Sequence, residues 1–280
     1  MDQDEKYDKI RDISKSDTKE EMLVKSRKTN KIYIHKIYIY GIDDIKKKYN
    51  ELKIIQSLNH PNIIKFHEIF KVKNPILSLN ILYEYVEGGS LYNRIQIQKN
   101  KKEYFTESQI LNWFTQICLG LNYIHSKKYI HRNLKTKNIF LTKNDQIKIG
   151  KFANAKKIES TIQNATKLIE ETSILAPELI EQKPYTNKID VWSLGIILYE
   201  LMTFKKPFEI QSLSLLFNKI KYGDYPDIKK LNYSKNLINL IGILLNINPD
   251  LRPSVNNILS KFLLMSLFRI QYFRKIYCKQ

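Results

Sequence analysis

One polar segment, HRNLKTKN at residues 131–138, concentrates side chains that could act on a ligand. It contains an imidazole, a guanidinium, two ammonium groups and two amides, but no carboxylate. The amides of Asn133 and Asn138 do not accept a proton at neutral pH, so neither can serve as a general base. A single neutral amide oxygen is also a poor magnesium site by itself. The segment therefore lacks both proton acceptance and a complete magnesium site.

The histidines and cysteines form no recognisable metal or redox motif. The five histidines show neither the paired spacing nor the cysteine neighbours of a zinc site. Cys118 lies in an apolar helical pattern, far along the chain from Cys278. We therefore expect two reduced thiols rather than a disulfide framework.

The elements that must position the polar residues divide into two parts. Residues 1 to about 85 contain alternating segments such as KIYIHKIYIY, typical of strands, and a helical stretch that ends near Leu58. From about residue 88 the pattern changes to long helical segments such as SQILNWFTQICLGLNYIHS. The 280 residues suit one two-lobed domain. We predict an α+β fold over residues 1–262, with a small β-rich lobe containing one major helix at about 7–86 and a large helical lobe at about 87–262.

The basic composition does not indicate a specific nucleic-acid site. The net charge is +19, but lysine is abundant along the whole chain and no arginine cluster or aromatic-interleaved basic stripe is present. Residues 263–280 form a basic amphipathic helix or tail, which we expect either to pack on its own domain or to contact an acidic membrane or protein. No run approaches the roughly 18 uncharged apolar residues of a membrane-spanning helix, and no signal peptide is evident, so a cytoplasmic protein is expected.

A spaced series of motifs resembles the eukaryotic protein kinases, and the block from Glu103 to Phe152 is most similar to the NIMA-related serine/threonine kinases. The series covers Tyr7 to about Phe262. In chain order the motifs are Lys36 in YIHK, Glu51 before LNHPNII, His131-Arg132 with Lys135 and Asn138, Phe152, Ala176-Pro177-Glu178, Asp190-Val191-Trp192 and Arg252 in RPS. Chance agreement over such a series is negligible, and the resemblance implies a bilobal kinase fold.

The resemblance implies that the residues supporting this fold are retained. The apolar column that joins the lobes is expected to consist of Ile55, Phe66, His131 and Phe152, with Asp190 holding its base. Glu178 and Arg252 match a buried ion pair of the family. Lys36 and Glu51 match the pair that positions nucleotide phosphates, although an ion pair that only holds the small-lobe helix is an equal alternative.

The same resemblance implies that the groups for phosphoryl transfer have been replaced. Transfer needs a carboxylate that receives the hydroxyl proton, and an aspartate and an asparagine that hold Mg²⁺. Asn133 occupies the position of the first carboxylate, beside Lys135, the lysine typical of serine/threonine kinases. Lys151 occupies the position of the metal-binding aspartate, where an ammonium repels Mg²⁺, so only Asn138 remains for a metal. We expect Lys151 to pair with Glu51.

The nucleotide pocket implied by the resemblance is altered as well. The three glycines of the phosphate loop are replaced by Ser14, Ser16 and Lys19, whose side chains should obstruct the close approach of phosphate. The altered positions around the adenine are Glu21, Ile34, Phe140 and, at the gatekeeper position, Tyr83. A carboxylate against an adenine face is unfavourable unless it is paired.

These features favour a pseudokinase that works without a cofactor, as a scaffold or allosteric regulator that binds other proteins. The family suggests an active kinase or cytoskeletal or ciliary components as partners, and hence a cytoskeletal or ciliary association. One alternative is a weakly active, ATP- and Mg²⁺-dependent serine/threonine kinase, because positioning alone accounts for much of catalysis. Another is a nucleotide-binding switch without phosphoryl transfer.

Overall fold

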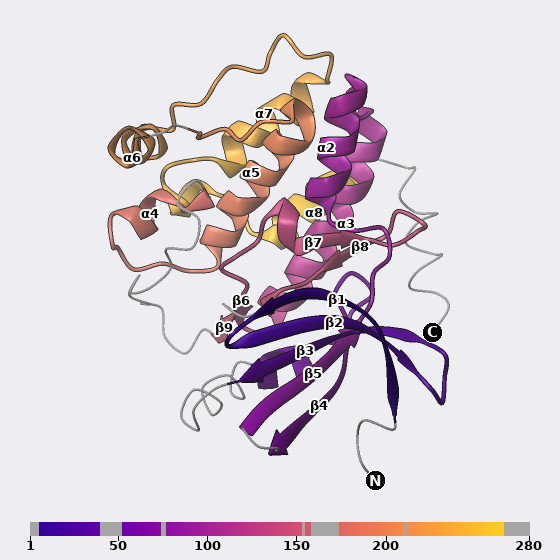
Figure 1. Ribbon diagram of the computed structural model, residues 1–280. Coiled ribbons are helices and arrows are strands. Elements are labelled where there is room, and N and C mark those ends of the chain that lie inside the picture. The colour runs from indigo at the N-terminus through magenta and orange to yellow at the C-terminus, as the bar shows by residue number, and fades with distance from the viewer. Residues whose placement is uncertain are drawn as a thin grey trace.

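The computed structural model describes residues 6–39, 52–73, 77–152, 155–157, 174–209 and 212–265. Figure 1 shows a sheet on one side and a group of helices on the other. The sheet contains β1 (Tyr7–Ser16), β2 (Lys19–Ser26), β3 (Ile32–Ile39), β4 (Phe66–Lys73) and β5 (Leu77–Glu84). Residues 52–56, between β3 and β4, are helical. The prediction of a bilobal α+β fold is confirmed by this arrangement.

The second lobe is mostly helical and carries two short two-stranded sheets. Its helices are α2 (Leu91–Lys101), α3 (Glu107–Ser126), α4 (Pro177–Ile180), α5 (Lys188–Thr203), α6 (Leu213–Tyr222), α7 (Lys235–Leu244) and α8 (Val255–Met265), with the 3₁₀ turns η2 (Thr136–Asn138) and η5 (Pro249–Leu251). Its strands are β6 (Tyr129–Ile130), β7 (Ile139–Leu141), β8 (Ile147–Ile149) and β9 (Lys156–Lys157), paired β6 with β9 and β7 with β8.

The five-stranded sheet is antiparallel throughout and has the order β1-β2-β3-β5-β4. Strand β5 lies between β3 and β4, and its Leu79, Ile81 and Leu82 have no exposed surface. The register between β2 and β3 places Glu21 directly opposite Lys36. Side chains directly opposite in an antiparallel pair lie on the same face, so this register brings a carboxylate and an ammonium together.

Helix α5 forms the centre of the helical lobe. Every residue from Ile189 to Met202 is buried, as expected for a mostly apolar helix that is surrounded by protein. Helix α3 supplies the large side chains Trp113 and Phe114 to the same core, and begins at the cap Thr106, whose hydroxyl accepts a hydrogen bond from the amide of Gln109. The second lobe is therefore a packed support for the loops between β6 and β9.

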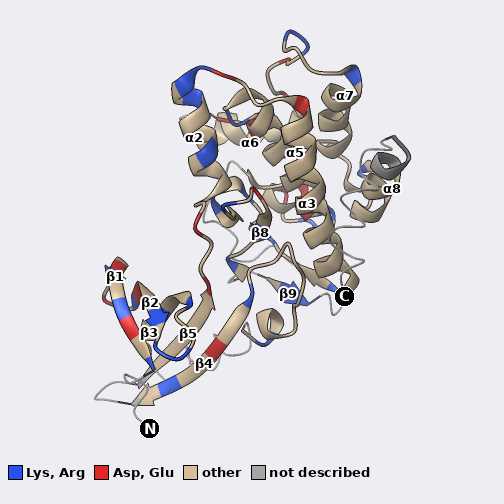
Figure 2. Ribbon diagram, turned by 90° about the vertical axis from the view of Figure 1, so that its right-hand side faces the viewer, with Lys and Arg blue, Asp and Glu red and all other residues tan. Residues whose placement is uncertain are grey.

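Lysine and arginine occur on both lobes rather than on one helix or strand (Figure 2). None of the helices in the described part of the chain is long and apolar enough to span a membrane. The basic segment expected at residues 263–280 lies largely beyond the last described residue, Met265, so its role stays a prediction.

A Gly-Gly turn connects the two lobes between β5 and α2. The amide of Gly88 donates to the carbonyl oxygen of Leu141 at 2.8 Å, and the amide of Leu141 donates to the carbonyl of Gly89 at 2.9 Å. A Cβ atom added to Gly88 would lie 2.3 Å from the carbonyl oxygen of Leu141. Gly89 has φ of +73°, in the left-handed region that favours glycine. The turn therefore requires glycine for close backbone contact and for its backbone angle.

The Gly88→Ala variant is expected to lose about 1–3 kcal/mol of unfolding free energy, because the new methyl group must displace backbone. Chemical denaturation of the purified protein measures this loss. Gly242→Ala is the matched control, since that glycine is exposed on α7 and an added Cβ meets nothing closer than the Tyr225 hydroxyl oxygen at 3.6 Å. Equal stability of the two variants would contradict the tight contact at Gly88.

Candidate functional site

A cavity of about 590 Å³ lies between the sheet and the helical lobe. This volume is typical of sites for small molecules. Six of the predicted pocket residues line it, namely Lys19, Glu21, Ile34, Lys36, Tyr83 and Phe140. Asn133 and Lys151 line it as well, together with Ile55 and Phe152 of the predicted column. The structure therefore gathers most of the predicted site into one cleft.

Glu21 and Lys36 form an ion pair inside this cleft. The distance from Lys36 Nζ to Glu21 Oε1 is 3.1 Å, and the side chains are only 16% and 15% exposed. The ammonium of Lys19 contacts the same carboxylate oxygen. Burial raises the pKa of Glu21, but the charges of Lys36 and Lys19 outweigh it and hold that pKa below its ordinary value. The carboxylate expected to disturb the pocket is therefore paired with two lysines.

Lys36 remains in an unfavourable electrostatic environment despite this pair. Burial lowers its pKa, the Glu21 carboxylate opposes that effect, and the neighbouring charges of Lys19 and Lys151 lower it further, so that the pKa lies below its ordinary value. The ammonium also lies 5.6 Å from the centre of the Tyr83 ring. Glu51 lies outside the described residues, so its predicted pairs with Lys36 and Lys151 stay predictions.

The predicted phosphate loop is an antiparallel hairpin of β1 and β2, with irregularities in the pairing between Lys9 and Arg11 and between Asp12 and Ser14. Ser14 pairs with Glu21 and Ser16 with Lys19, and none of these four residues has a positive φ. Neither serine is part of the cavity lining. The hydroxyl of Ser16 instead donates to the carbonyl of Lys19 at 3.1 Å. Lys19 and Glu21 line the cavity at this end, whereas the two serines do not, and the predicted obstruction of phosphate stays a prediction.

Two lining residues of β1, Arg11 and Ile13, are absent from the sequence-based site. The motif comparison considered only the positions of the replaced glycines and therefore did not include these two residues. The available signal was the alternation of side chains along a strand, which places residues two apart on the same face. Lys137 is a further basic lining residue that the motif comparison missed.

The segment between β6 and β7 is anchored by Asp190, which has no exposed surface. Its carboxylate accepts hydrogen bonds from the backbone amides of His131 and Arg132, both at 2.9 Å, and lies 2.8 Å from His125 Nε2. Burial raises the pKa of Asp190, but the contacts with His125 and His131 outweigh it, so the pKa lies below its ordinary value. This network orients the following residues, beginning with Asn133, toward the cleft.

The three predicted catalytic residues do not all face this cavity. Asn133 lines it, while Asn138 is buried beneath, where its Nδ2 donates to the carbonyl of Asn133 at 2.7 Å. Asn138 Oδ1 is buried and has no hydrogen-bond partner within the described ranges. Lys135 lines a separate small void beside Thr136 and Glu200. Only Asn133 therefore presents its side chain to the cleft.

Lys151 is exposed to the cleft in a left-handed backbone conformation, with φ of +59°. The preceding Gly150 donates its amide to the carbonyl of Asn138 at 2.9 Å, which places Lys151 next to the buried asparagine. Among the residues that the structure describes, no group of histidine, cysteine, aspartate or glutamate side chains is able to hold a metal ion. The donors present at this edge do not fit Mg²⁺, which is bound in proteins mainly through carboxylates.

His131 and Phe152 of the predicted apolar column are in contact, while the continuous column of four residues stays a prediction. The rings of His131 and Phe152 meet edge to face, with centroids 5.0 Å apart, and His131 has no exposed surface. Ile55 is buried, and Phe66 packs edge to face against Tyr83. These contacts hold the position of Phe152, and hence of the adjacent Lys151.

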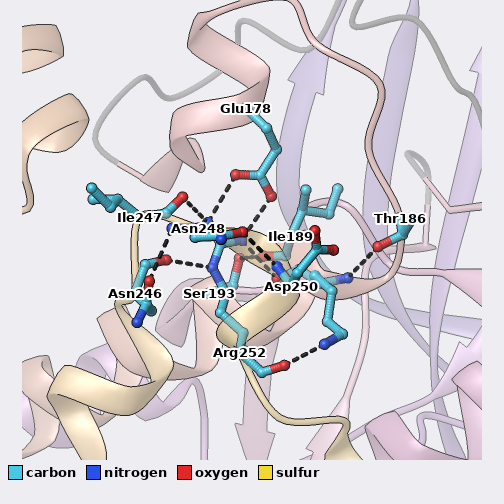
Figure 3. Close-up of polar contacts among 10 residues, drawn as sticks. Glu178, Thr186, Ile189, Ser193, Asn246, Ile247, Asn248, Asp250 and Arg252 are labelled. Carbon is cyan, nitrogen blue, oxygen red and sulfur yellow. Dashed lines mark hydrogen bonds and ion pairs between the residues drawn. The ribbon is translucent and has the colours of Figure 1, made fainter.

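Glu178 and Arg252 form a buried bidentate ion pair (Figure 3). The two nitrogen–oxygen distances are 2.7 Å and 2.8 Å, and the side chains are 4% and 0% exposed. The guanidinium also lies over the ring of Trp192, 5.0 Å from its centre. The pair joins α4 to the segment between η5 and α8.

Comparison with known proteins places these features in one family. The protein kinase domain family matches residues 9–264. The serine/threonine-protein kinase Nek1 of Mus musculus is 40% identical over 260 residues, which are 92% of this chain and 21% of that protein. Nek3 of Mus musculus is 37% identical over 91% of this chain and 49% of its own length, and Nek5 of Homo sapiens is 37% identical over 94% and 37%.

The chain spans less than half the length of these relatives. The matched part nevertheless contains the sheet, the cleft and the helical lobe. Similarity over this whole architecture, together with the order of the motifs, identifies the chain as a NIMA-related member of the protein kinase superfamily.

Proposed function

We propose that this protein is a catalytically inactive kinase homologue that acts as a scaffold or allosteric regulator by binding other proteins. The observation that carries the proposal is the placement of Asn133 and Lys151 in the lining of the cleft. Both occupy positions where phosphoryl transfer requires carboxylates. The site therefore has an amide in place of the base and an ammonium in place of the metal ligand.

The chemical consequences of the two replacements add to one another. A positioned general base contributes about 10²- to 10⁴-fold to a rate, and the Asn133 amide does not supply it. The metal neutralises the charge of the phosphates during transfer, and Lys151 cannot bind it. Lys36, which remains, is already engaged by Glu21. Loss of phosphoryl transfer follows from these groups together.

Retention of the supporting structure favours a role in protein binding. The Asp190 network and the Glu178–Arg252 pair are complete although the groups for the reaction are replaced. A chain that keeps the fold but not the chemistry still presents kinase-like surfaces to a partner. An active kinase or a cytoskeletal or ciliary component is the partner that the family resemblance favours.

A weakly active, ATP- and Mg²⁺-dependent serine/threonine kinase is the alternative. It is favoured by the names of the relatives, which are serine/threonine-protein kinases, and by the buried Asn138, whose Oδ1 is without a partner in the described structure. A nucleotide-binding switch without transfer is a further alternative that the size of the cleft favours.

The test is incorporation of labelled phosphate from ATP into the protein itself and into a general protein substrate, with Mg²⁺ or Mn²⁺. We expect no incorporation above that of a Lys36→Met variant, which serves as the control for contaminating kinases. Incorporation that is lost in both Lys36→Met and Asn138→Ala would instead support the active alternative.

A further inference from the structure

The inner part of the cleft contains more positive than negative charge. The ammonium groups of Lys19, Lys36 and Lys151 line it, while the single carboxylate of Glu21 contacts the first two. Of the other lining carboxylates, Glu84 is the last residue of β5 and is paired with Lys148 at 2.9 Å, while Glu87 lies in the linker that follows. Within the described structure Lys151 has no ion-pair partner. Among the described residues that line the cleft, five side chains are cationic and three are carboxylates, so positive charge exceeds negative charge by two; the cations are Lys19, Lys36, Lys151, Arg11 and Lys137.

The electrostatic environment of Lys36 shows that this excess positive charge is unfavourable. Its side chain is largely shielded from solvent, and the nearby charges of Lys19 and Lys151 lower its pKa in the same direction as this shielding, disfavouring the ammonium form. An anion placed among these lysines would relieve the repulsion between them. The cleft has a volume of about 590 Å³, which is large enough to admit a ligand of nucleotide size.

A metal ion chelated by the polyphosphate would weaken the attraction between the polyphosphate and these lysines. Mg²⁺ removes negative charge from a polyphosphate chain and needs oxygen ligands from the protein. At the edge where Asn138 and Lys151 lie, the chain offers one buried amide oxygen and one ammonium. The ammonium repels the metal but attracts the unchelated phosphate oxygens.

We propose that this cleft binds a polyphosphate chain without metal, and that Mg²⁺ weakens this binding. The ligand chemistry is that of an unchelated polyphosphate, as found in a nucleoside triphosphate or in inorganic polyphosphate. Lys151 contacts the phosphate oxygens from the side where kinases of known activity place the metal. The inference rests on the proposed function, since it uses the same replacement of the metal ligand.

Glu21 acts as an internal competitor for the same lysines. Its carboxylate lies at 3.1 Å from Lys36 Nζ, so an entering phosphate must replace it there. Glu21→Gln removes the charge with little change in shape and is expected to tighten binding. Lys151→Ala removes a charged contact and is expected to weaken it about 10- to 100-fold. The two variants therefore shift affinity in opposite directions.

The experiment is titration calorimetry of the purified protein with ATP, tripolyphosphate or adenosine, in EDTA or in excess Mg²⁺ at matched ionic strength. We expect ATP and tripolyphosphate to bind in EDTA, and excess Mg²⁺ to weaken both. Binding of ATP but not tripolyphosphate would identify a nucleotide as the source of the polyphosphate, and equal affinity for the two would show that the base contributes nothing to binding. Adenosine alone is expected not to bind.

Lys229→Ala is the matched control, because this lysine is 81% exposed and pairs with Asp227 outside the cleft. It is expected to keep the wild-type affinity. The inference is overturned if neither polyphosphate binds, if Mg²⁺ strengthens binding, or if Lys229→Ala weakens binding as much as Lys151→Ala. Phosphate transfer is assayed on the same samples: transfer would refute the proposed function, whereas absence of both binding and transfer would refute this inference alone.

Discussion

Arg252→Ala is expected to destabilise the fold by about 3–5 kcal/mol, because it leaves the Glu178 carboxylate buried without its partner. The arginine makes two bonds to Glu178 and donates to the backbone oxygens of Lys188, Asn246 and Ile247 as well. All of these are lost in the variant. A loss of this size is a large part of the roughly 5–15 kcal/mol by which most domains are stable.

Chemical denaturation followed by circular dichroism measures this effect. Arg27→Ala is the matched control, since Arg27 pairs with Asp8 at a similar 2.8 Å but both side chains are 55% exposed. An exposed pair of this kind contributes about 0–1 kcal/mol. A loss at Arg252 no larger than that at Arg27 would show that the buried pair contributes little.

A double-mutant cycle separates the pair from the rest of the arginine's contacts. Replacing Glu178 and Arg252 together by methionine removes both charges, so no uncompensated charge stays buried. We expect the double variant to be more stable than Arg252→Met alone. If the double variant loses as much unfolding free energy, relative to the wild type, as the two single variants lose together, the two side chains do not act as a pair.

Restoring both carboxylates, Asn133→Asp together with Lys151→Asp, is expected to raise phosphoryl transfer at least about 10²-fold above either single variant. Asn133→Asp alone restores a base but no metal ligand, and Lys151→Asp alone restores a metal ligand but no base. Asn138 lies beneath the cleft, and its buried Oδ1 has no hydrogen-bond partner among the described residues. Aspartate also tolerates the left-handed backbone at residue 151 better than most residues do.

Labelled phosphate incorporation with Mg²⁺ and ATP measures this gain. The double variant carrying Lys36→Met is the control and should stay inactive, because the family resemblance assigns the phosphate contact to Lys36. Wild-type activity equal to that of the double variant would mean that Asn133 and Lys151 do not limit transfer. Activity in Asn133→Asp alone would mean that Lys151 does not exclude the metal.

Local sequence patterns were sufficient to predict the two lobes and to locate the replaced residues. Strand alternation before residue 85 and helical spacing after residue 88 predict the two lobes, because side-chain period follows secondary structure. Asn133, Lys151, Glu178 and Arg252 could be placed from motifs alone, since each lies at a fixed distance from recognisable neighbours in the chain.

Which side chains meet inside the cleft depends on the tertiary structure. Glu21 and Lys36 are 15 residues apart in sequence and meet only through the register of β2 on β3. That register depends on the turn between the strands and on which faces are buried, neither of which a motif records. In the same way, Lys135 points to a different void and Ser16 bonds back to its own hairpin.

The sequence by itself therefore determined the family resemblance, the two lobes and the absence of the two carboxylates, because these are properties of residue types in chain order. The tertiary structure alone decided which charges share the cleft: the carboxylate of Glu21 lies against Lys19 and Lys36, and Asn138 is buried beneath. Charge balance depends on distances between side chains that are remote in sequence, and those distances exist only in the folded chain.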